Sequence, residues 1–325
     1  MTTVLVAGGA GYIGAHMCKL LALHGYTPIV VDNLTFGHKE FVKWGPLIVG
    51  DIADKDLIRQ TIRTYKPIAV FHFSAFTYVG ESVTEPKKYY QNNVVGTINL
   101  LDSIIEMGVK SFIFSSTCAT FGIPQTEFLS ETHPQNPINP YGMSKLIIEK
   151  CIADYSRAYD LKSVIFRYFN AAGADPDGEI GEDHQPETHL IPIVLDVALK
   201  KREFVSIFGD DYPTPDGTCI RDYIHINDLG SAHLLGLEYL IKKGETTSFN
   251  LGNGQGFSVK EIISKTEEIT GHSIPTQISP RRAGDPPKLV GDSEKARSVL
   301  GWNPQFHRIE DIISTAWNWH QKRFK

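Results

Sequence analysis

Cysteine is scarce in this sequence of 325 residues, which has four cysteines and no CxxC pair. The spacing offers no disulfide framework, so we expect reduced thiols rather than a fold held by disulfides. The four are Cys18, Cys118, Cys151 and Cys219.

Long apolar runs and an excess of basic charge are also missing. No apolar run approaches ~20 residues, so no transmembrane helix is expected. The chain opens directly into the apolar residues 4–7, without the basic start and longer apolar stretch of a signal peptide. A formal net charge of -5 argues against nucleic acid or a membrane as a partner. We expect a cytoplasmic protein without a metal site, in which any anionic ligand meets a local basic site.

What the sequence does have is a regular alternation of short apolar runs and amphipathic stretches in its first half. The expected strands are 4–7, 28–31, 47–49, 69–72, 111–115 and 163–166, and the expected helices are 12–24, 55–65, 87–107 and 144–159. The strands are apolar almost throughout, which suits parallel strands covered on both faces. The alternation predicts an α/β fold with a Rossmann-type doubly wound parallel sheet.

The composition changes after residue 170, where 171–186 is rich in Gly, Asp and Pro, and 210–218 is a second irregular stretch. Long irregular stretches within a compact protein are usually functional loops. Helical patterns return at 191–200, 228–241, 259–270, 293–300 and 309–322. We predict a Rossmann domain over 1–170 and a smaller C-terminal α/β substrate domain over 171–325. Residues 225–251, with a strand expected at 248–251, are predicted to pack back onto the first domain.

A glycine-rich motif follows the first expected strand and opens the first expected helix. Alone, such a motif is weak evidence, but the strand–turn–helix context strengthens it. Glycine permits the tight turn and lets a pyrophosphate approach backbone N–H groups, while the helix N-terminus supplies partial positive charge. The motif predicts dinucleotide binding by Gly8, Gly11, Tyr12, Ile13 and Gly14.

Asp32 ends the second expected strand, 18 residues after Gly14. A carboxylate there can accept both ribose hydroxyl hydrogens of NAD and would repel the 2′-phosphate of NADP. The alternative is a plain turn formed by Asp32 and Asn33. Asp51 follows the third strand and could bond the adenine amino group, with Ile52 against the ring, although alone this pair would indicate only a strand-end turn. As a set, these residues predict NAD.

Tyr141 and Lys145 lie four residues apart at the start of a helical stretch, just after Pro140, so they share one helix face. Tyrosine has an ordinary pKa of about 10 and is a poor base at neutral pH. A neighbouring ammonium and a positive nicotinamide ring both favour the phenolate, and Lys145 can also hold the nicotinamide ribose. The alternative is a surface pair on a helix. It is disfavoured because the hydroxyl residues 115–117 end a strand, at the sheet edge where ligands bind in such folds.

These motifs resemble extended short-chain dehydrogenase/reductases and, in detail, UDP-galactose 4-epimerases. The resemblance extends over nearly the whole chain, and its second-half motifs, such as RYFNAAG at 167–173 and RDYIH at 221–225, are the more specific ones. The other segments that carry it are 8–16, 31–34, 72–73, 79–82, 114–122, 141–145 and 281–285.

The resemblance implies reversible hydride transfer at C4 of a UDP-hexose through a 4-ketose, with tightly bound NAD, in a homodimer. It makes Tyr141 the catalytic base and acid, with Lys145 lowering its pKa and Thr117 bonding the reacting O4. Further cofactor contacts are implied at Asn33, Phe73, Ser74, Ala75, Thr77, Asn92, Ser116 and Phe169. Substrate contacts are implied at Asn170, His189, Leu190, Phe208, Arg221, Tyr223, Arg282, Asp285 and Leu289. Thr77 departs from relatives that have a pyrophosphate-binding Lys there, so backbone N–H groups or other donors must take that role.

Several alternatives stay open. A sugar-nucleotide 4,6-dehydratase would carry an Asp-Glu pair after the strand-end Thr, whereas Cys118 and Ala119 follow Thr117 and cannot do that acid–base work. A UDP-glucuronate decarboxylase is not excluded, and a non-catalytic NAD-binding protein would lack Tyr141 or Lys145. The sugar is open among UDP-glucose, UDP-N-acetylglucosamine, a UDP-pentose and a UDP-uronate. It depends on pocket volume near Leu289, the implied gate to the 2-substituent.

Overall fold

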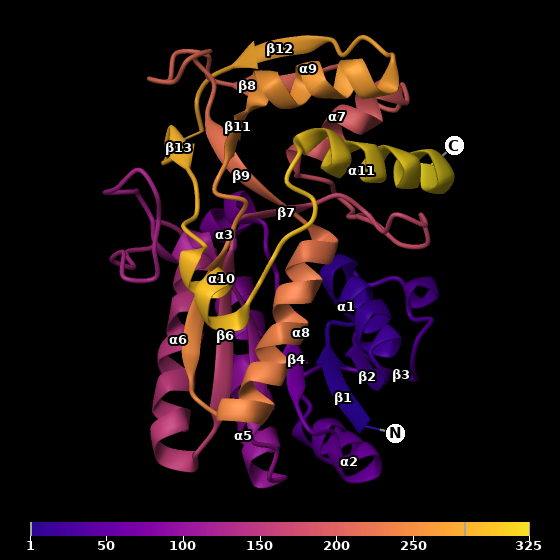
Figure 1. Cartoon of the computed structure of the whole chain (residues 1–325), viewed down its shortest axis with the longest axis vertical. Helices are drawn as coiled ribbons and strands as arrows, with labels where there is room; N and C mark the ends of the chain where they lie inside the picture. Colours follow the sequence, from indigo (N-terminus) through magenta and orange to yellow (C-terminus); the bar gives the residue numbers. More distant parts are fainter. Residues whose placement is uncertain (1, 283, 325) are drawn as a thin grey trace.

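The computed structural model describes residues 2–282 and 284–324, and only the backbone of Lys243. A seven-stranded parallel sheet, with six strands from residues 2–168 and one from residues 247–251, organises the larger part of the fold (Figure 1). Its strand order is β10-β6-β5-β4-β1-β2-β3, with every neighbouring pair parallel. The strands are β1 (Thr2–Ala7), β2 (Tyr26–Asp32), β3 (Leu47–Val49), β4 (Val70–His72), β5 (Ser111–Thr117), β6 (Lys162–Tyr168) and β10 (Thr247–Leu251). The order from β3 to β6 reverses direction between β1 and β4, as in dinucleotide-binding sheets. The predicted Rossmann-type fold is therefore confirmed.

Helices cover both faces of this sheet (Figure 1). They are α1 (Tyr12–Leu23), α2 (Lys55–Tyr65), α5 (Thr97–Glu106), α6 (Pro140–Tyr159) and α8 (Ile226–Lys243). Successive strand residues point to opposite faces. Val4 and Val6 accordingly pack in one core with α1 and α8, whereas Leu5 and Ala7 pack in another with α2, α5 and α6. Burial on both faces explains the apolar strands. Among the described helices, none is long and apolar enough to cross a membrane.

A smaller second layer continues from the carboxyl end of β6 (Figure 1). One sheet joins β7 (Asn170–Ala172), β9 (Ile220–His225), β11 (Gly256–Ser258) and β13 (Lys288–Leu289), and β8 (Val205–Phe208) pairs with β12 (Thr276–Ser279). The helices of this layer are α7 (Leu190–Ala198), α9 (Val259–Thr270) and α11 (Ile309–Phe324), whereas α10 (Glu294–Leu300) packs against α8 and β10 of the first sheet. Apolar residues of α7, α9 and α11 form a third core with β8 and β9.

The chain returns to the first sheet after β9. The helix α8 packs against α1, and β10 becomes the seventh strand, with Thr247 opposite Val164 of β6. Residues 226–251 therefore lie on the large sheet. The division of the chain into domains at residue 170 remains a prediction.

The six strands predicted in the first half and the one at 248–251 are present, but other elements differ from the prediction. The helix expected at 87–107 consists of α4 (Pro86–Tyr89), a π-helical stretch (Tyr90–Gly96) and α5. The helix expected from residue 144 begins at Pro140, where the Asn139 side chain accepts from the Gly142 N–H at 2.8 Å. The strands β7, β8, β9, β11, β12 and β13 and the helix α3 (Val79–Thr84) were not predicted, and the first two residues of the expected loop 171–186 belong to β7.

Asp222, in the middle of β9, ties three segments of the second layer together. Its carboxylate accepts from the backbone N–H groups of Asn253 at 2.7 Å, Gly254 at 3.1 Å and Gly291 at 3.1 Å. Burial raises its pKa to about 7, and the three N–H groups oppose that rise. These bonds fix β9 against the chain that leads to β11 and the chain that follows β13, and so they fix the residues on either side of Asp222.

Candidate active site

The turn between β1 and α1 has no room for side chains at two positions. Gly8 has a φ of +80°, and a Cβ there would lie 2.6 Å from the Ser74 nitrogen, while a Cβ at Gly14 would lie 2.1 Å from the Gly8 oxygen. The helix α1 begins after Gly11, and no side chain among residues 2–282 and 284–324 caps it. Uncapped N–H groups and the helix dipole suit a pyrophosphate. The turn therefore fits the predicted dinucleotide.

The two remaining residues of the motif, Tyr12 and Ile13, face protein. The Tyr12 hydroxyl donates to the Gly173 carbonyl at 2.7 Å, across to the chain after β7. Ile13 packs against the core shared by α1 and α8. Tyr12 thus connects the glycine turn to the second layer.

Asp32, Asn33 and Asp51 come together at the carboxyl ends of β2 and β3. The Asp32 carboxylate accepts from two backbone N–H groups, at 2.8 and 3.0 Å. Asn33 Nδ2 donates to Asp51 Oδ2 at 2.9 Å, and Ile52 is buried beside them. Burial raises the pKa of Asp32, and its two N–H partners oppose that rise. The residues predicted to bind the adenosine half of NAD are therefore neighbours.

Four of the residues predicted to contact the cofactor lie in the segment that directly follows β4. Of these, Phe73, Ser74 and Ala75 are half-buried and Thr77 is exposed. Asn92 donates to Asn93 Oδ1 at 2.9 Å. The buried Asn93 also bonds both the N–H and the carbonyl of Phe76, each at 2.9 Å. Asn93 was not predicted, and it positions this segment.

Tyr141, Lys145 and Thr117 meet where α6 lies against the end of β5. Lys145 is buried, and its Nζ donates to the Ser115 carbonyl at 2.7 Å. Burial lowers the pKa of Lys145 to about 7, and nearby Glu149 opposes that fall. Burial raises the pKa of Tyr141, and a hydrogen bond with Thr117 opposes that rise. Burial is the largest influence on the Tyr141 hydroxyl in the protein alone, and the implied lowering of its pKa by Lys145 remains a prediction.

Glu149 completes this face of α6 and was not predicted. It accepts from the Ser116 hydroxyl and pairs with Arg167 Nη2 at 2.7 Å, with all three side chains buried. The Ser116 hydroxyl, implied as a cofactor contact, is thus engaged with Glu149. The available signal was spacing, because Glu149 follows Lys145 by the same four residues that separate Lys145 from Tyr141.

The basic residues predicted to hold UDP lie in the second layer. Arg221, on β9, forms an ion pair with Asp285, and the strand register places it opposite Leu289 of β13. The Arg282 guanidinium lies 4.0 Å from the ring centroid of Phe208, in a cation–π contact. Two guanidinium groups and an exposed ring are therefore available to a nucleoside diphosphate.

The remaining predicted residues join this region to the first sheet. Asn170 Nδ2 donates to the Asp222 carbonyl at 2.8 Å, and β7 pairs Asn170 with the buried Tyr223. Phe169 and Leu289 share a small apolar cluster with Phe121 and Leu129. The implied cofactor residue Phe169 and the implied gate Leu289 therefore touch the same cluster.

His189 and Leu190 begin α7. The His189 Nδ1 atom lies 2.8 Å from Glu187 and 2.9 Å from Glu182, two carboxylates that the sequence did not single out. The implied substrate residue His189 is therefore part of a second polar cluster.

Comparison with known proteins places this site in a family. Residues 5–315 match the family model described as GDP-mannose 4,6 dehydratase. The chain is 52% identical to a UDP-glucose 4-epimerase of Rhizobium leguminosarum bv. trifolii over 98% of each chain. Its fold matches the crystal structure of UDP-glucose 4-epimerase from Brucella ovis in complex with NAD, with a TM-score of 0.96 and 50% identity over 98% of each chain. It also matches the UDP-Glc/GlcNAc 4-epimerase of Campylobacter jejuni, with a TM-score of 0.87 and 42% identity over 99% of this chain and 100% of that one.

The nucleotide-binding sheet and the Tyr141–Lys145 pair define an extended short-chain dehydrogenase/reductase. Within that class, the full-length identities show that the chain belongs to the family of UDP-glucose 4-epimerases. The matching family model is named after a dehydratase, but Cys118 and Ala119 stand after Thr117 and provide no carboxylate.

Replacing Lys145 by Met should stabilise the nucleotide-free protein most at low pH. Because burial lowers the folded-state pKa to about 7, below the ordinary value of about 10.4, the folded state disfavours the ammonium. Below pH 7 the lysine is protonated in both states and the full penalty applies. As the pH rises from 7 towards 10, the folded protein releases the proton and the penalty falls. We expect Lys145→Met to raise the melting temperature at pH 6 by about 2 °C or more, and by less at pH 9.

Thermal unfolding at both pH values measures this difference. Lys150→Met is the matched control, because Lys150 is exposed on the same helix, and it should change the melting temperature equally at both values. A gain for Lys145→Met that is as large at pH 9 as at pH 6 would contradict the assignment.

Proposed function

We propose that the protein interconverts UDP-galactose and UDP-glucose by epimerisation at C4, with tightly bound NAD. The observation that carries the proposal is the Tyr141 hydroxyl, hydrogen-bonded to Thr117 at the carboxyl edge of β5, with Lys145 buried one turn along α6. When bound, NAD supplies a hydride acceptor for C4 and a positive ring near Tyr141. The glycine turn and the cluster of Asp32, Asn33 and Asp51 are the parts of the chain that would hold it.

Tyr141 acts as base and then as acid in this proposal. It takes the proton of the 4-hydroxyl while Thr117 holds O4, and it returns the proton to O4 after the 4-ketose has presented its other face. Because burial raises the pKa of Tyr141, its phenolate needs positive charge nearby. Lys145 supplies part of that charge from within α6, and it is held in place through the Ser115 carbonyl.

The UDP group must stay fixed while the hexose turns. Arg221 and Arg282 offer charge-assisted bonds to a pyrophosphate, and Phe208 offers a ring face. Arg221 pairs with Asp285 in the protein alone, so substrate binding must share or replace that ion pair. In this proposal Leu289, whose register partner is Arg221, is the residue expected beside the sugar.

The purified protein should convert UDP-galactose without added cofactor, and Tyr141→Phe should lower kcat about 10²–10⁴-fold. The substitution removes only the ionisable hydroxyl, so the NAD released on denaturation should stay unchanged. Product separation and a nucleotide assay measure both quantities.

Tyr155→Phe is the control for this substitution. Tyr155 lies on the same helix, where its hydroxyl bonds Asp102 at 2.5 Å, and its removal should leave kcat within a few-fold. Turnover of Tyr141→Phe near that of the unmutated chain would show that another group moves the proton. Full dependence on added NADP would overturn the role of Asp32.

We further propose that the sugar site accepts a 2-acetamido group at least in part. Leu289 is aliphatic and half-buried, whereas an aromatic side chain there would fill the space that an acetyl group needs. The similar Campylobacter jejuni protein is described as acting on both UDP-Glc and UDP-GlcNAc, which supports this reading.

Leu289→Tyr should suppress conversion of UDP-N-acetylglucosamine and spare UDP-galactose. Lys288→Tyr adds the same ring one residue away on β13, where Lys288 pairs with Glu127 at 2.8 Å, and it should affect the two substrates equally. UDP-arabinose, tested separately, reports on pentoses. Equal losses on both hexoses for Leu289→Tyr, or no conversion of the acetylated sugar by the unmutated chain, would contradict the proposal that Leu289 controls access of the 2-substituent.

The cytoplasmic location stays a prediction.

We also propose that the protein is a homodimer whose interface is formed by the helical stretch 79–106. Exposed apolar residues of this stretch support the dimer, namely Val79, Val83, Tyr90 and Val95. Sedimentation should give twice the chain mass of 36.2 kDa, and Val83→Asp should shift the protein towards the monomer. A monomer at micromolar concentration would contradict the proposal.

A further inference from the structure

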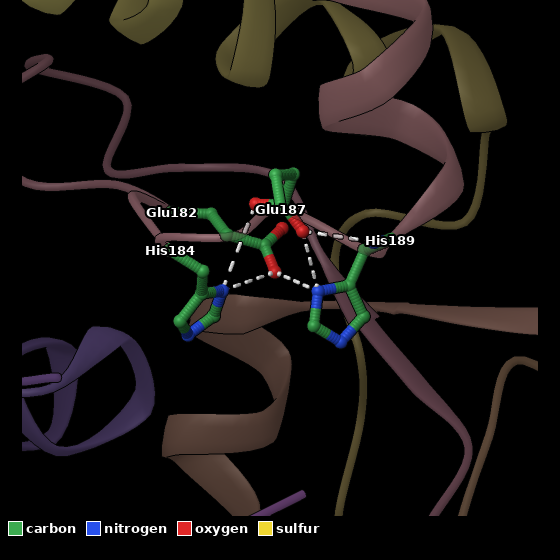
Figure 2. Close-up of side chains that lie close together, drawn as sticks. All are labelled: Glu182, His184, Glu187 and His189. Carbon is green, nitrogen blue, oxygen red and sulfur yellow. Dashed lines mark hydrogen bonds and ion pairs between the residues drawn. The ribbon is translucent and has the colours of Figure 1, made fainter. Parts of the chain in front are cut away.

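Four side chains converge in the chain between β7 and α7, which has no helix or strand among its described residues 173–189. They are Glu182, His184, Glu187 and His189, and Figure 2 shows both carboxylates and both imidazole Nδ1 atoms turned towards one centre. One potential ligand atom from each residue lies within 4.8 Å of all the others. The residues follow an E-x-H-x-x-E-x-H pattern in the sequence.

The distances between these atoms suit a single bound ion. His184 Nδ1 lies 3.3 Å from Glu182 and 3.7 Å from Glu187, and His189 Nδ1 lies 2.9 and 2.8 Å from the same two carboxylates. Tetrahedral coordination at zinc–ligand distances of about 2.0–2.2 Å separates ligand atoms by about 3.3 Å. The observed separations lie on both sides of that value.

One of the four atoms lacks an ordinary partner. His184 Nδ1 is buried, and its contacts are two carboxylate oxygens at 3.3 and 3.7 Å, which do not meet ordinary hydrogen-bond geometry. A buried imidazole nitrogen normally has a partner. A lone pair aimed at a metal ion would satisfy it.

The charges also need compensation. The side chains of Glu182 and Glu187 are only 7% and 12% exposed, and two buried carboxylates side by side repel each other. A divalent ion with two carboxylates and two neutral imidazoles makes a neutral group. The other acidic cluster of the described chain, Asp175, Asp177 and Glu179, is already neutralised in part by Lys19, so the same argument does not apply there.

We propose that Glu182, His184, Glu187 and His189 bind one divalent transition-metal ion, with zinc the best match. Two imidazoles and two carboxylates suit zinc and its neighbours, whereas calcium and magnesium prefer oxygen ligands in larger numbers. Four protein ligands fill a tetrahedral shell, so the site is structural. This departs from the sequence-based expectation of no metal, and it does not depend on the proposed function.

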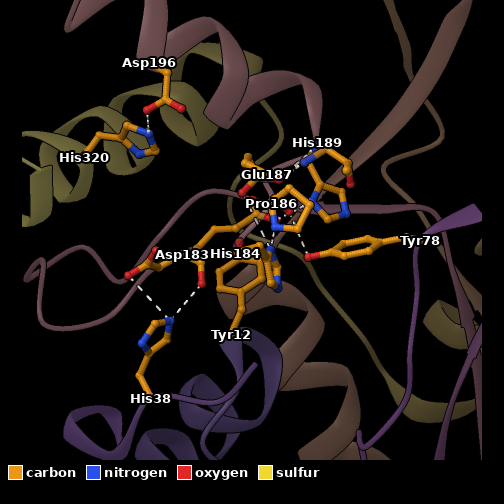
Figure 3. A network of polar contacts seen from close by, with 12 residues as sticks. Tyr12, His38, Tyr78, Asp183, His184, Pro186, Glu187, His189, Asp196 and His320 are labelled. Atoms are coloured by element: carbon orange, nitrogen blue, oxygen red, sulfur yellow. Dashed lines mark hydrogen bonds and ion pairs between the residues drawn. The ribbon is translucent and has the colours of Figure 1, made fainter. Parts of the chain in front are cut away.

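The site would brace the chain between both layers of the protein. Figure 3 shows Tyr12 and Tyr78 beside His184, with ring centroids 6.4 and 6.5 Å away. The Tyr78 hydroxyl donates to the Pro186 carbonyl at 2.9 Å, and Trp319 of α11 donates to the Glu182 carbonyl at 3.0 Å. An ion here would hold residues of the glycine turn, the segment after β4 and the start of α7 in one arrangement.

The alternative is a quartet of charges without metal, in which both imidazoles are protonated. Burial opposes protonation, but the two carboxylates raise the pKa of His184 to about 9 and also raise the pKa of His189 well above its ordinary value. The quartet accounts for the charges, yet its contacts to His184 Nδ1, at 3.3 and 3.7 Å, are longer than ordinary hydrogen bonds. Metal analysis separates the two descriptions.

The test uses the full chain, purified without a histidine tag and with its nucleotide retained. Elemental analysis should find about one zinc per chain, or the chelated protein should take up one Zn²⁺ in a calorimetric titration. Chelation should lower the melting temperature, and one equivalent of Zn²⁺ should restore it. His184→Gln and Glu187→Gln should each weaken Zn²⁺ binding about tenfold or more.

His38→Gln is the matched control. His38 Nε2 contacts the same segment, 2.9 Å from the Asp183 carbonyl, but it is not a ligand, so this variant should bind Zn²⁺ like the unmutated chain. Equal loss in all three variants would show a general disturbance of the segment and overturn the assignment.

A measurement on the unmutated chain keeps the test independent of folding defects. Co²⁺ added to the chelated protein should give the intense visible absorption of tetrahedral coordination, and one equivalent of Zn²⁺ should remove it. No stoichiometric metal and no tetrahedral spectrum would leave the charge quartet as the correct description. Neither result involves epimerase activity, so failure here would be distinct from failure of the proposed function.

Discussion

The position of α6 along β5 sets the geometry on which the candidate active site depends. Three residues of one helix face bond the end of β5 at residues 115–117. Tyr141 bonds the first hydroxyl, that of Thr117, Lys145 bonds the Ser115 carbonyl, and Glu149 bonds the Ser116 hydroxyl. Because the three are spaced by four residues, a helix shifted by one residue would break all three contacts. The pair of Glu149 with Arg167 ties the same face to β6.

This arrangement sets stability against function. A buried ammonium whose pKa falls to about 7 is a penalty on folding, and a buried phenol resists ionisation. Both effects make the two groups responsive to a positive or negative charge placed beside them, because water does not screen that charge. The groups at this sheet edge thus reduce the stability of the protein alone, and a charged cofactor bound beside them would reduce that cost.

The first sheet could be predicted from the sequence because its strands are apolar on both faces and its turns carry glycine. The second layer could not, because β9 carries Arg221, Asp222 and His225 within six residues and so has no apolar run. Its charged residues are tolerated through specific partners that only the folded chain brings together. The candidate site divides in the same way: Tyr141 could be predicted from spacing, while the partners of Glu149 could not.

The segment 173–189 shows why irregular chain can still be ordered. It has no ladder of backbone bonds, so side chains must fix it. Asp183 pairs with Arg323 of α11 at 2.8 Å, and Tyr12 reaches the start of the segment from the glycine turn. The segment ends at His189, where α7 begins, so any change in its position moves that helix start relative to the glycine turn. A metal ion bound at residues 182–189 would therefore connect the nucleotide-binding sheet to the second layer. In this segment no backbone ladder of hydrogen bonds makes that connection.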